Sequence, residues 1–217
     1  MRLLKASLAV GQMTLLSRVA GFVRDIVIAN AFGAAAAADA FFVAFRIPNL
    51  FRRLFAEGSF SQAFVPVLGE YRERHDHDSV RLLVASVAGV LGAVLALITA
   101  AGILAAPLLV LLVAPGFADE PDRYGLTVEM LRITFPYLLF ISLAALAGSV
   151  LNTFGRFTIP AFSPVLLNLA MIAAALLVAP RMDRPVVALA WGVFAGGVLQ
   201  LGIQLPALRR LALLSWP

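Results

Sequence analysis

A stretch of 37 residues without a charge, Leu82 to Ala118, constrains this chain most strongly. A helix crosses the hydrocarbon core of a bilayer in about 20 apolar residues, so the stretch is too long for one upright span and short for two spans with a turn. We therefore predict one long membrane helix over residues 82–114, bent near Pro107 and ended by Pro115 and Gly116.

The rest of the sequence is similarly apolar, with 62% hydrophobic residues, 13% charged residues and a mean hydropathy of +0.96. Such values are typical of proteins whose solvent is lipid. The 217 residues suffice for about six spans and leave no room for a separate soluble domain. We predict an all-α polytopic membrane protein, one unit over residues 1–217, with a loop and an interfacial helix over 51–81 and with spans near 8–32, 34–50, 82–114, 133–155, 157–180 and 185–208.

The distribution of Lys and Arg predicts how these spans are oriented, because short cytoplasmic loops carry the basic excess. With the N-terminus in the cytoplasm, ten basic residues fall on the cytoplasmic side and three on the outer side. Both chain ends are then expected in the cytoplasm. The basic residues are dispersed at span ends instead of gathered on one polar face, so nucleic acid is not an expected partner despite a pI near 10.7.

Three charged residues, Arg18, Arg24 and Asp25, interrupt the first apolar stretch. Each charge near the centre of a membrane helix costs about 2.5 to 3.5 kcal/mol unless it faces a partner or a watery cavity, so these charges indicate a functional site. The two arginines are about 120° apart on an ideal helix, and both reach one cavity if the helix bends near Gly21 or if their long side chains converge. We expect Asp25 to pair with one of them.

Arginines that lack acidic partners in a low-dielectric cavity bind phosphate or carboxylate through paired hydrogen bonds, and they keep their charge. An anionic ligand is therefore expected. Diphosphate-linked lipids, phosphorylated metabolites and anionic drugs all satisfy this chemistry, and residue spacing does not choose among them.

Other polar residues give weaker signals. His75 and His77 lie in a polar run without a recognisable third ligand, so no metal is expected. Asn168 and Gln200 lie inside predicted spans, where such side chains usually hydrogen-bond between helices. The predicted spans contain no nucleophile, His–acid pair or metal cluster, and the chain has no cysteine. These observations argue against an enzyme, and no cofactor is expected.

Long strings of unusual polar and aromatic residues occur in order along the chain. They are MTLLSRVAGFVRD from Met13, ADAFFVAFRIPN from Ala38 and LFRRLFAEGSFSQAFVP from Leu50, followed by shorter strings at Ala114–Phe117, Ile133–Tyr137, Leu151–Thr153, Ile159–Phe162 and Gln204–Pro206. In these strings the chain closely resembles the MurJ (MviN) lipid II flippase family over nearly its whole length.

The resemblance implies the N-terminal lobe of a transporter of the multidrug/oligosaccharidyl-lipid/polysaccharide exporter superfamily, in the bacterial inner membrane. Such a protein moves lipid II, the undecaprenyl-diphosphate-linked peptidoglycan precursor, from the cytoplasmic to the periplasmic leaflet by alternating access. The family requires arginines at the positions of Arg18, Arg24 and Arg52 and an acid at Asp39, and all four are present. The three arginines are therefore expected to hold the diphosphate of lipid II in a cationic cavity.

The remaining polar residues of these strings have supporting roles in this interpretation. Asp25 is expected to orient an arginine, and polar contacts that open or close one side of the cavity are expected from Asp39, Ser17 and Glu57. The family has fourteen helices in two lobes, so the chain is expected to need a missing C-terminal lobe as its partner. Alone, it is expected to bind lipid II poorly and to transport nothing.

Three other functions stay open. An exporter of another lipid-linked oligosaccharide or of a drug would share the helix count but is expected to lack the Arg18, Arg24 and Arg52 set. An intramembrane enzyme acting on lipid diphosphates would need reactive groups that the predicted spans lack. A non-transporting membrane scaffold has little reason to bury three arginines and would tolerate Arg24→Ala.

Overall fold

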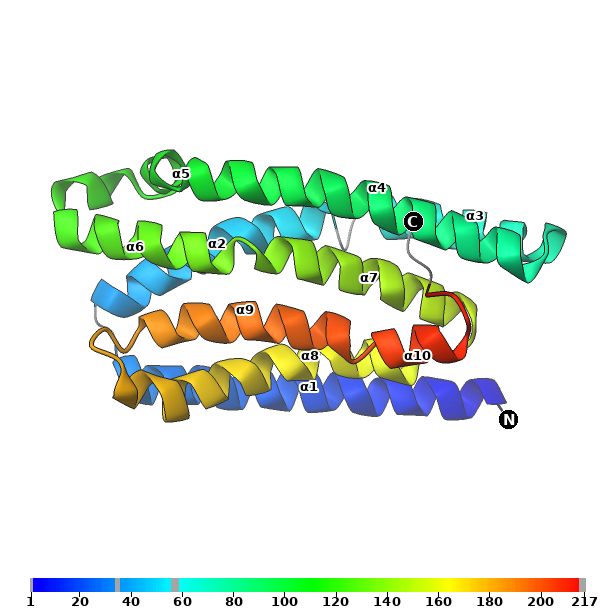
Figure 1. Ribbon diagram of the computed structural model, residues 1–217. Helices are drawn as coiled ribbons and strands as arrows, with labels where there is room; N and C mark the ends of the chain where they lie inside the picture. The colour runs from blue at the N-terminus through cyan, green and yellow to red at the C-terminus, as the bar shows by residue number, and fades with distance from the viewer. Residues whose placement is uncertain (1, 34–35, 56–58, 215–217) are drawn as a thin grey trace.

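The computed structural model describes residues 2–33, 36–55 and 59–214, which form helices and turns without a strand. Figure 1 shows that the long helices run side by side across the molecule. The first half of the chain contains α1 (Arg2–Phe32), α2 (Ala36–Phe55), α3 (Ser59–Arg74), α4 (His77–Leu104) and α5 (Ala106–Val113). The second half contains η1 (Pro115–Asp119), α6 (Pro121–Thr134), α7 (Tyr137–Thr153), α8 (Thr158–Ala173), η2 (Ala174–Val178), η3 (Ala179–Arg181), α9 (Val187–Gly202) and α10 (Leu205–Arg210).

Helices that are distant in sequence pack against one another. α1 lies along α8, α8 and α7 both pack against α9, and α2 packs against α6. The beginning of α1, the turn between α7 and α8, and α10 lie at one end of the bundle, whereas the beginning of α2, η1 and η3 lie at the other end (Figure 1). The chain therefore enters and leaves the described bundle at the same end.

Four segments are long and apolar enough to cross a membrane, namely His77–Leu104, Pro121–Thr153, Thr158–Arg181 and Val187–Arg210. α1 with 31 residues and α2 with 20 residues lie beside them in the bundle. The predicted all-α multi-pass fold is confirmed by this arrangement. The number of six crossings stays a prediction.

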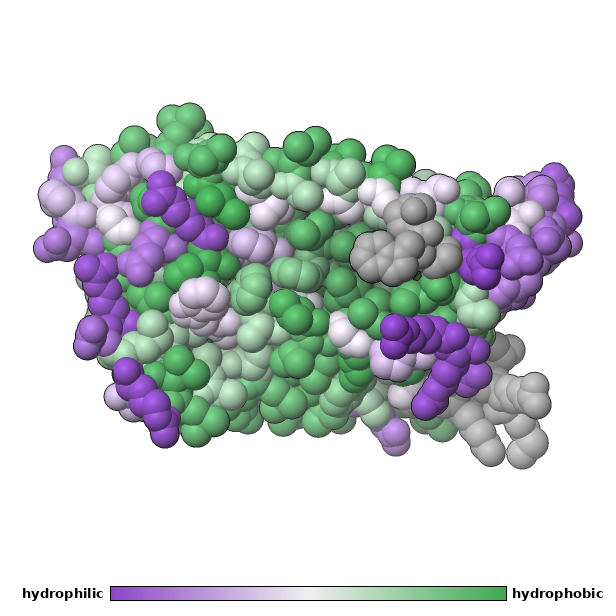
Figure 2. Space-filling view, in the orientation of Figure 1, coloured by the Kyte–Doolittle hydropathy of each residue, from purple (hydrophilic) through white to green (hydrophobic). Residues whose placement is uncertain are grey.

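The surface is apolar across the middle of the molecule. Figure 2 shows a broad green band with hydrophilic residues gathered mainly toward the two ends. Large side chains such as those of Val90, Leu97 and Leu104 are 68%, 71% and 79% exposed. A soluble protein rarely exposes so much contiguous apolar surface, whereas lipid solvates it without penalty.

The long uncharged stretch is divided close to where the sequence predicts. α4 ends at Leu104, and α5 begins at Ala106 with Pro107 in its first turn. α5 then ends at Val113, just before Pro115 starts a short 3₁₀ helix. The prolines therefore act as predicted, because each removes a backbone donor that a continuing helix would need.

Other helix boundaries differ from the sequence prediction. α2 continues through Pro48 and ends at Phe55, because packing against α6 outweighs the one helix hydrogen bond that the proline removes. The helix predicted within 51–81 is α3. α6 begins at Pro121 instead of near Ile133, since a proline can start a helix without a backbone N–H donor.

An aromatic cluster joins α2 to α7 and to the turn between α6 and α7. Phe41, Phe135 and Tyr137 are at most 2% exposed, and the ring of Phe45 lies 5.9 Å from that of Phe41 and 6.0 Å from that of Tyr137. Gly102 of α4 faces the Phe135 ring so closely that a Cβ there would lie 2.1 Å from its carbons. This cluster fixes α2 in the bundle and so positions the end of α2, which carries Arg52.

Candidate anion-binding site

α1 and α8 lie side by side and run in the same direction (Figure 1). Arg24 of α1 donates from Nε and Nη2 to Oδ1 of Asp25, at 2.9 and 2.7 Å, and from Nη1 to Oδ1 of Asn168 on α8, at 2.9 Å. The predicted ion pair between Asp25 and an arginine is confirmed. The Arg24 side chain is 25% exposed and that of Asp25 is 64% exposed, so the cation lies in the helix interface and the acid outside it.

Asn168 connects the two helices. It is buried, and it donates from Nδ2 to the backbone carbonyl of Ser17 at 3.1 Å while it accepts from Arg24. Gly21 lies opposite this amide, where a Cβ would be 3.6 Å from Nδ2. The expectation that Asn168 hydrogen-bonds between helices is confirmed. Because the amide is neutral, it orients Arg24 without cancelling its charge.

Arg18 lines a hollow of about 430 Å³ between α1 and the first turns of α8. The hollow is also lined by Ser17 of α1, Asn152 of α7, and Pro160 and Pro164 of α8. α1 is one continuous helix across this region. Arg18 and Arg24 therefore both reach α8 through their long side chains, which is one of the two routes that the sequence left open.

Arg52 lines a second, smaller hollow of about 170 Å³, and Pro160 and Pro164 border it as well. Arg52 Nε donates to Oδ1 of Asn49 at 2.9 Å, which holds the guanidinium at the end of α2. Pro160, Pro164 and Asn168 recur every four residues, so they form one stripe about 12 Å long on α8.

The three arginines reach this stripe from two different helices, α1 and α2. We call the stripe together with Arg18, Arg24 and Arg52 the arginine site. Guanidinium groups keep their charge at every accessible pH, and a low-dielectric surrounding strengthens their attraction to anions. The arginine site is therefore suited to a ligand that carries more than one anionic oxygen.

Asp39 lies away from the arginine site. Asp39 lies near the beginning of α2, about 20 Å along the helix from Arg52. Its Oδ2 accepts from Nη2 of Arg123 on α6 at 3.0 Å, and Arg123 also bonds Glu120 at 3.2 Å. Glu57 lies outside the described residues.

Arg123, one of the three basic residues predicted on the outer side, is a further functional candidate. Its side chain is 20% exposed and its guanidinium lies 4.0 Å above the ring centroid of Phe117. The short charged run Asp119 to Arg123 is a local signal that could have identified this residue. Nothing in that run indicates that its partner is Asp39, which is 84 residues away.

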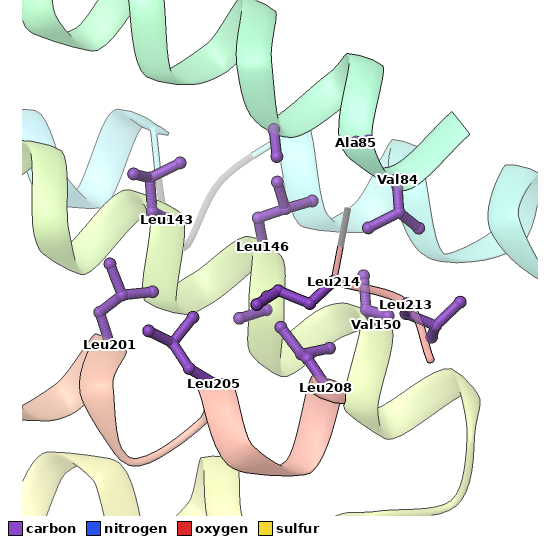
Figure 3. A pocket seen from close by; sticks show the side chains of 12 residues that line it. Val84, Ala85, Leu143, Leu146, Val150, Leu201, Leu205, Leu208, Leu213 and Leu214 are labelled. Atoms are coloured by element: carbon purple, nitrogen blue, oxygen red, sulfur yellow. The ribbon is translucent and has the colours of Figure 1, made fainter. Parts of the chain in front are cut away.

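A third hollow has a different character. It lies between α4, α7 and α10, and its lining is apolar, with Val84, Leu146, Leu205 and Leu208 turned toward one another (Figure 3). Among the described residues, no charged side chain lines it, so it does not suit an anion. The described residues also hold no group of three or more His, Cys, Asp or Glu side chains that could hold a metal ion.

Fold and site together define an all-α, multi-pass membrane protein with arginines gathered along the face of its helix bundle that carries α1. Comparison with known protein families identifies the family to which the chain belongs. The family model described as lipid II flippase MurJ matches residues 28–217. The chain belongs to this family, which is one of transport proteins and not of enzymes, and it is a multi-pass protein of the bacterial inner membrane.

Individual relatives agree with the family model. The chain is 53% identical to the lipid II flippase MurJ of Burkholderia cenocepacia, over 97% of this chain and 41% of that protein. It is 50% identical to a probable lipid II flippase MurJ of Haemophilus influenzae, over 94% of this chain and 42% of that protein. A solved structure of lipid II flippase MurJ in an inward closed conformation has a TM-score of 0.78 at 25% identity, over 93% of this chain and 42% of that one.

The chain thus spans about two fifths of the length of the relatives that it matches. The family model begins at residue 28, after Arg18 and Arg24, whereas the relative from Vibrio cholerae, 47% identical, is matched over 100% of this chain and 42% of its own length. The similarity therefore includes the helix that carries these two arginines.

Proposed function

We propose that this chain is part of a transporter that moves lipid II from the cytoplasmic to the periplasmic leaflet and that the arginine site binds the diphosphate of lipid II. The observation that carries the proposal is the convergence of Arg18, Arg24 and Arg52 on one stripe of α8. A diphosphate offers several anionic oxygens, and each guanidinium fork can bind two of them. Membership of the flippase family supports the same substrate.

Each arginine has a distinct part in this proposal. Arg18 and Arg52 present their guanidinium groups from neighbouring hollows, and Arg24 exchanges the carboxylate of Asp25 for a phosphate oxygen while Asn168 keeps it in place. Binding drives transport only if its strength differs between the inward-facing and outward-facing states. The exposed Asp25 provides that difference by competing with the phosphate in one of the two states.

The Asp39–Arg123 pair lies toward the end of the bundle at which α2 begins, away from the start of α1. We propose that the start of α1 is cytoplasmic, so that this pair helps to close the periplasmic side while Glu57 and Ser17 contribute polar contacts on the cytoplasmic side. The outer end carries fewer basic residues in this orientation, as the positive-inside rule requires. Six crossings follow if α1 and α2 both span the membrane.

Transport is proposed to need the part of the relatives' length that this chain does not span. A second lobe would provide the other wall of the cavity next to α1 and α2, since alternating access requires two bodies that rock about a shared site. The chain by itself is expected to bind lipid II weakly and to transport none.

The test uses a chimera in which this chain replaces the corresponding part of the Burkholderia cenocepacia relative. Cells depleted of their own flippase receive the chimera, and the lipid II that becomes accessible on the periplasmic face is measured at equal expression. The unmodified chimera should restore access, and Arg24→Ala should reduce it at least tenfold. Arg184→Ala is the matched control, because Arg184 is 66% exposed and pairs with Glu129 away from the arginine site.

The outcomes test the substrate and the site separately. If the unmodified chimera accumulates but exposes no lipid II, lipid II is not the substrate, and the chain belongs either to an exporter of another lipid-linked oligosaccharide or a drug or to a scaffold without transport activity. If Arg24→Ala and Arg184→Ala both restore access fully, the arginine site does not bind the substrate.

A further inference from the structure

Neutral polar groups line the hollow that Arg52 occupies. Gln200 of α9, Gln204 at the α9–α10 junction and Ser163 of α8 face this hollow, and they are 2%, 2% and 5% exposed. Within the described residues, the Oε1 atoms of both glutamines are buried and have no hydrogen-bond partner. Buried acceptors are almost always satisfied in native proteins, so two free ones on the wall of a single hollow require an explanation.

The orientation of Gln204 is fixed by its own contacts. Its Nε2 donates to the backbone carbonyl of Gln200 at 3.1 Å, so Oε1 is the free end of the amide. Gly148 of α7 makes room for this oxygen, since a Cβ there would lie 3.4 Å from it. The two glutamines are four residues apart and share one helix face. Together they hold two unsatisfied acceptors beside the hollow, and a donor in the hollow can satisfy them once the side chains turn toward it.

The charges around the hollow indicate which hydrogen-bond donors of a ligand can bind in it. The Arg52 guanidinium repels a metal cation, and the glutamine carbonyl oxygens repel a second anionic group. Neutral hydroxyl and amide N–H groups are not repelled, and they donate the hydrogen bonds that the oxygens lack. A volume of about 170 Å³ corresponds to about six water molecules, which suits part of a sugar but not a whole disaccharide.

We propose that Gln200, Gln204 and Ser163 bind the hydroxyl or amide N–H groups of the sugar that is attached to the diphosphate. This inference rests on the proposed function, because it places the diphosphate at Arg52 and the adjoining sugar in the same hollow. The two subsites then recognise different parts of the same ligand. The arginines select any lipid diphosphate, and the glutamines select one that carries a sugar.

The test compares two ligands that differ only in the sugar-peptide head, lipid II and undecaprenyl diphosphate. The chimera is placed in lipid nanodiscs, and dissociation constants are measured for both. Gln200→Met should weaken lipid II binding about 3- to 10-fold, as expected for the loss of one or two neutral hydrogen bonds, and leave undecaprenyl diphosphate binding unchanged. Arg52→Ala should weaken the binding of both ligands.

Thermal unfolding without ligand distinguishes a binding role from a structural one. Gln200→Met removes an unsatisfied buried acceptor, so the Tm should stay the same or rise by a few degrees while lipid II affinity falls. Thr99→Val is the matched control, because Thr99 of α4 also has a buried side-chain oxygen without a partner but does not line this hollow. It should change neither affinity.

Three results would overturn the inference. Unchanged lipid II affinity in Gln200→Met means that the hollow holds water only, and the proposed function survives if the unmodified chimera binds both ligands. An equal loss for both ligands means that Gln200 acts through Arg52 and not on the sugar. Failure of the unmodified chimera to bind either ligand overturns the proposed function and this inference with it.

Discussion

α8 packs against α9 and α1 in two different ways. On the α9 side, a Cβ at Gly196 would lie 2.6 Å from Cδ1 and 3.0 Å from Cα of Leu167, and one at Gly192 would lie 2.8 Å from the Cβ of Ala174, which follows α8 in η2. On the α1 side, the corresponding distance from Gly21 to Asn168 is 3.6 Å, and a hollow of about 430 Å³ lies next to it.

The difference shows how a membrane protein separates its rigid parts from its binding parts. Lipid supplies no hydrophobic drive between helices, so they associate through close packing of small residues or through polar contacts. The α8–α9 interface relies on close packing of small residues, whereas the α1–α8 interface relies on polar contacts. α1, which carries Arg18 and Arg24, therefore packs less closely against α8 at Gly21 than α9 does at Gly192 and Gly196.

The largest effect is expected from Gly196→Ala on the closely packed side. The added methyl group overlaps both the side chain and the backbone of Leu167, and overpacking of this kind costs about 1–3 kcal/mol. Because the chimera is more than twice as long as this chain, its Tm in detergent should fall by only about 1 to 3 °C. Gly202→Ala on the same helix is the control, because nothing lies within 4 Å of a Cβ there. Equal Tm values for the two variants would contradict the description of this interface.

A change of charge at Asn168 should act on binding more than on folding. Asn168→Asp keeps an oxygen that accepts from Arg24 but adds a negative charge, so it should weaken lipid II binding about tenfold. Asn168→Ala, which adds no charge, should weaken binding less. If both variants bind lipid II equally, the neutrality of the α1–α8 contact is not what keeps Arg24 available.

Removal of the competing acid should have a smaller and opposite effect. The Asp25 side chain is 64% exposed, and exposed ion pairs contribute about 0–1 kcal/mol to stability. Asp25→Asn should therefore leave the Tm within about 2 °C and strengthen lipid II binding up to about threefold, with the gain largest at low ionic strength. Weaker binding at every salt concentration would show that Asp25 positions Arg24 instead of competing for it.

The smallest effect is expected from Gly21→Ala. The same added methyl group that disrupts the α9 side of α8 meets only an ordinary contact at 3.6 Å on the α1 side. Stability should change by less than about 0.5 kcal/mol, and lipid II transport by the chimera should be retained. A Tm loss as large as that of Gly196→Ala would mean that both sides of α8 are packed equally tightly.

Much of the site could be predicted from the sequence because local patterns carry it. Charges inside an apolar stretch identified Arg18, Arg24 and Asp25, and the pairing of Asp25 with an arginine needs only neighbouring positions on one helix. The partner of Asp39 could not be predicted in the same way. Arg123 is 84 residues away, and its approach depends on how α2 packs against α6.

Local sequence patterns are enough to establish that lipid is the solvent of this chain, that its elements are helices, and that arginines mark its candidate site. These properties follow from hydropathy and from backbone hydrogen bonding, which act over about 20 residues at a time. Which polar groups meet depends on how the helices pack. Arg24 reaches Asn168 across 144 residues, and Arg52 shares a hollow with Gln200 and Gln204, because helix packing joins faces that no local periodicity relates.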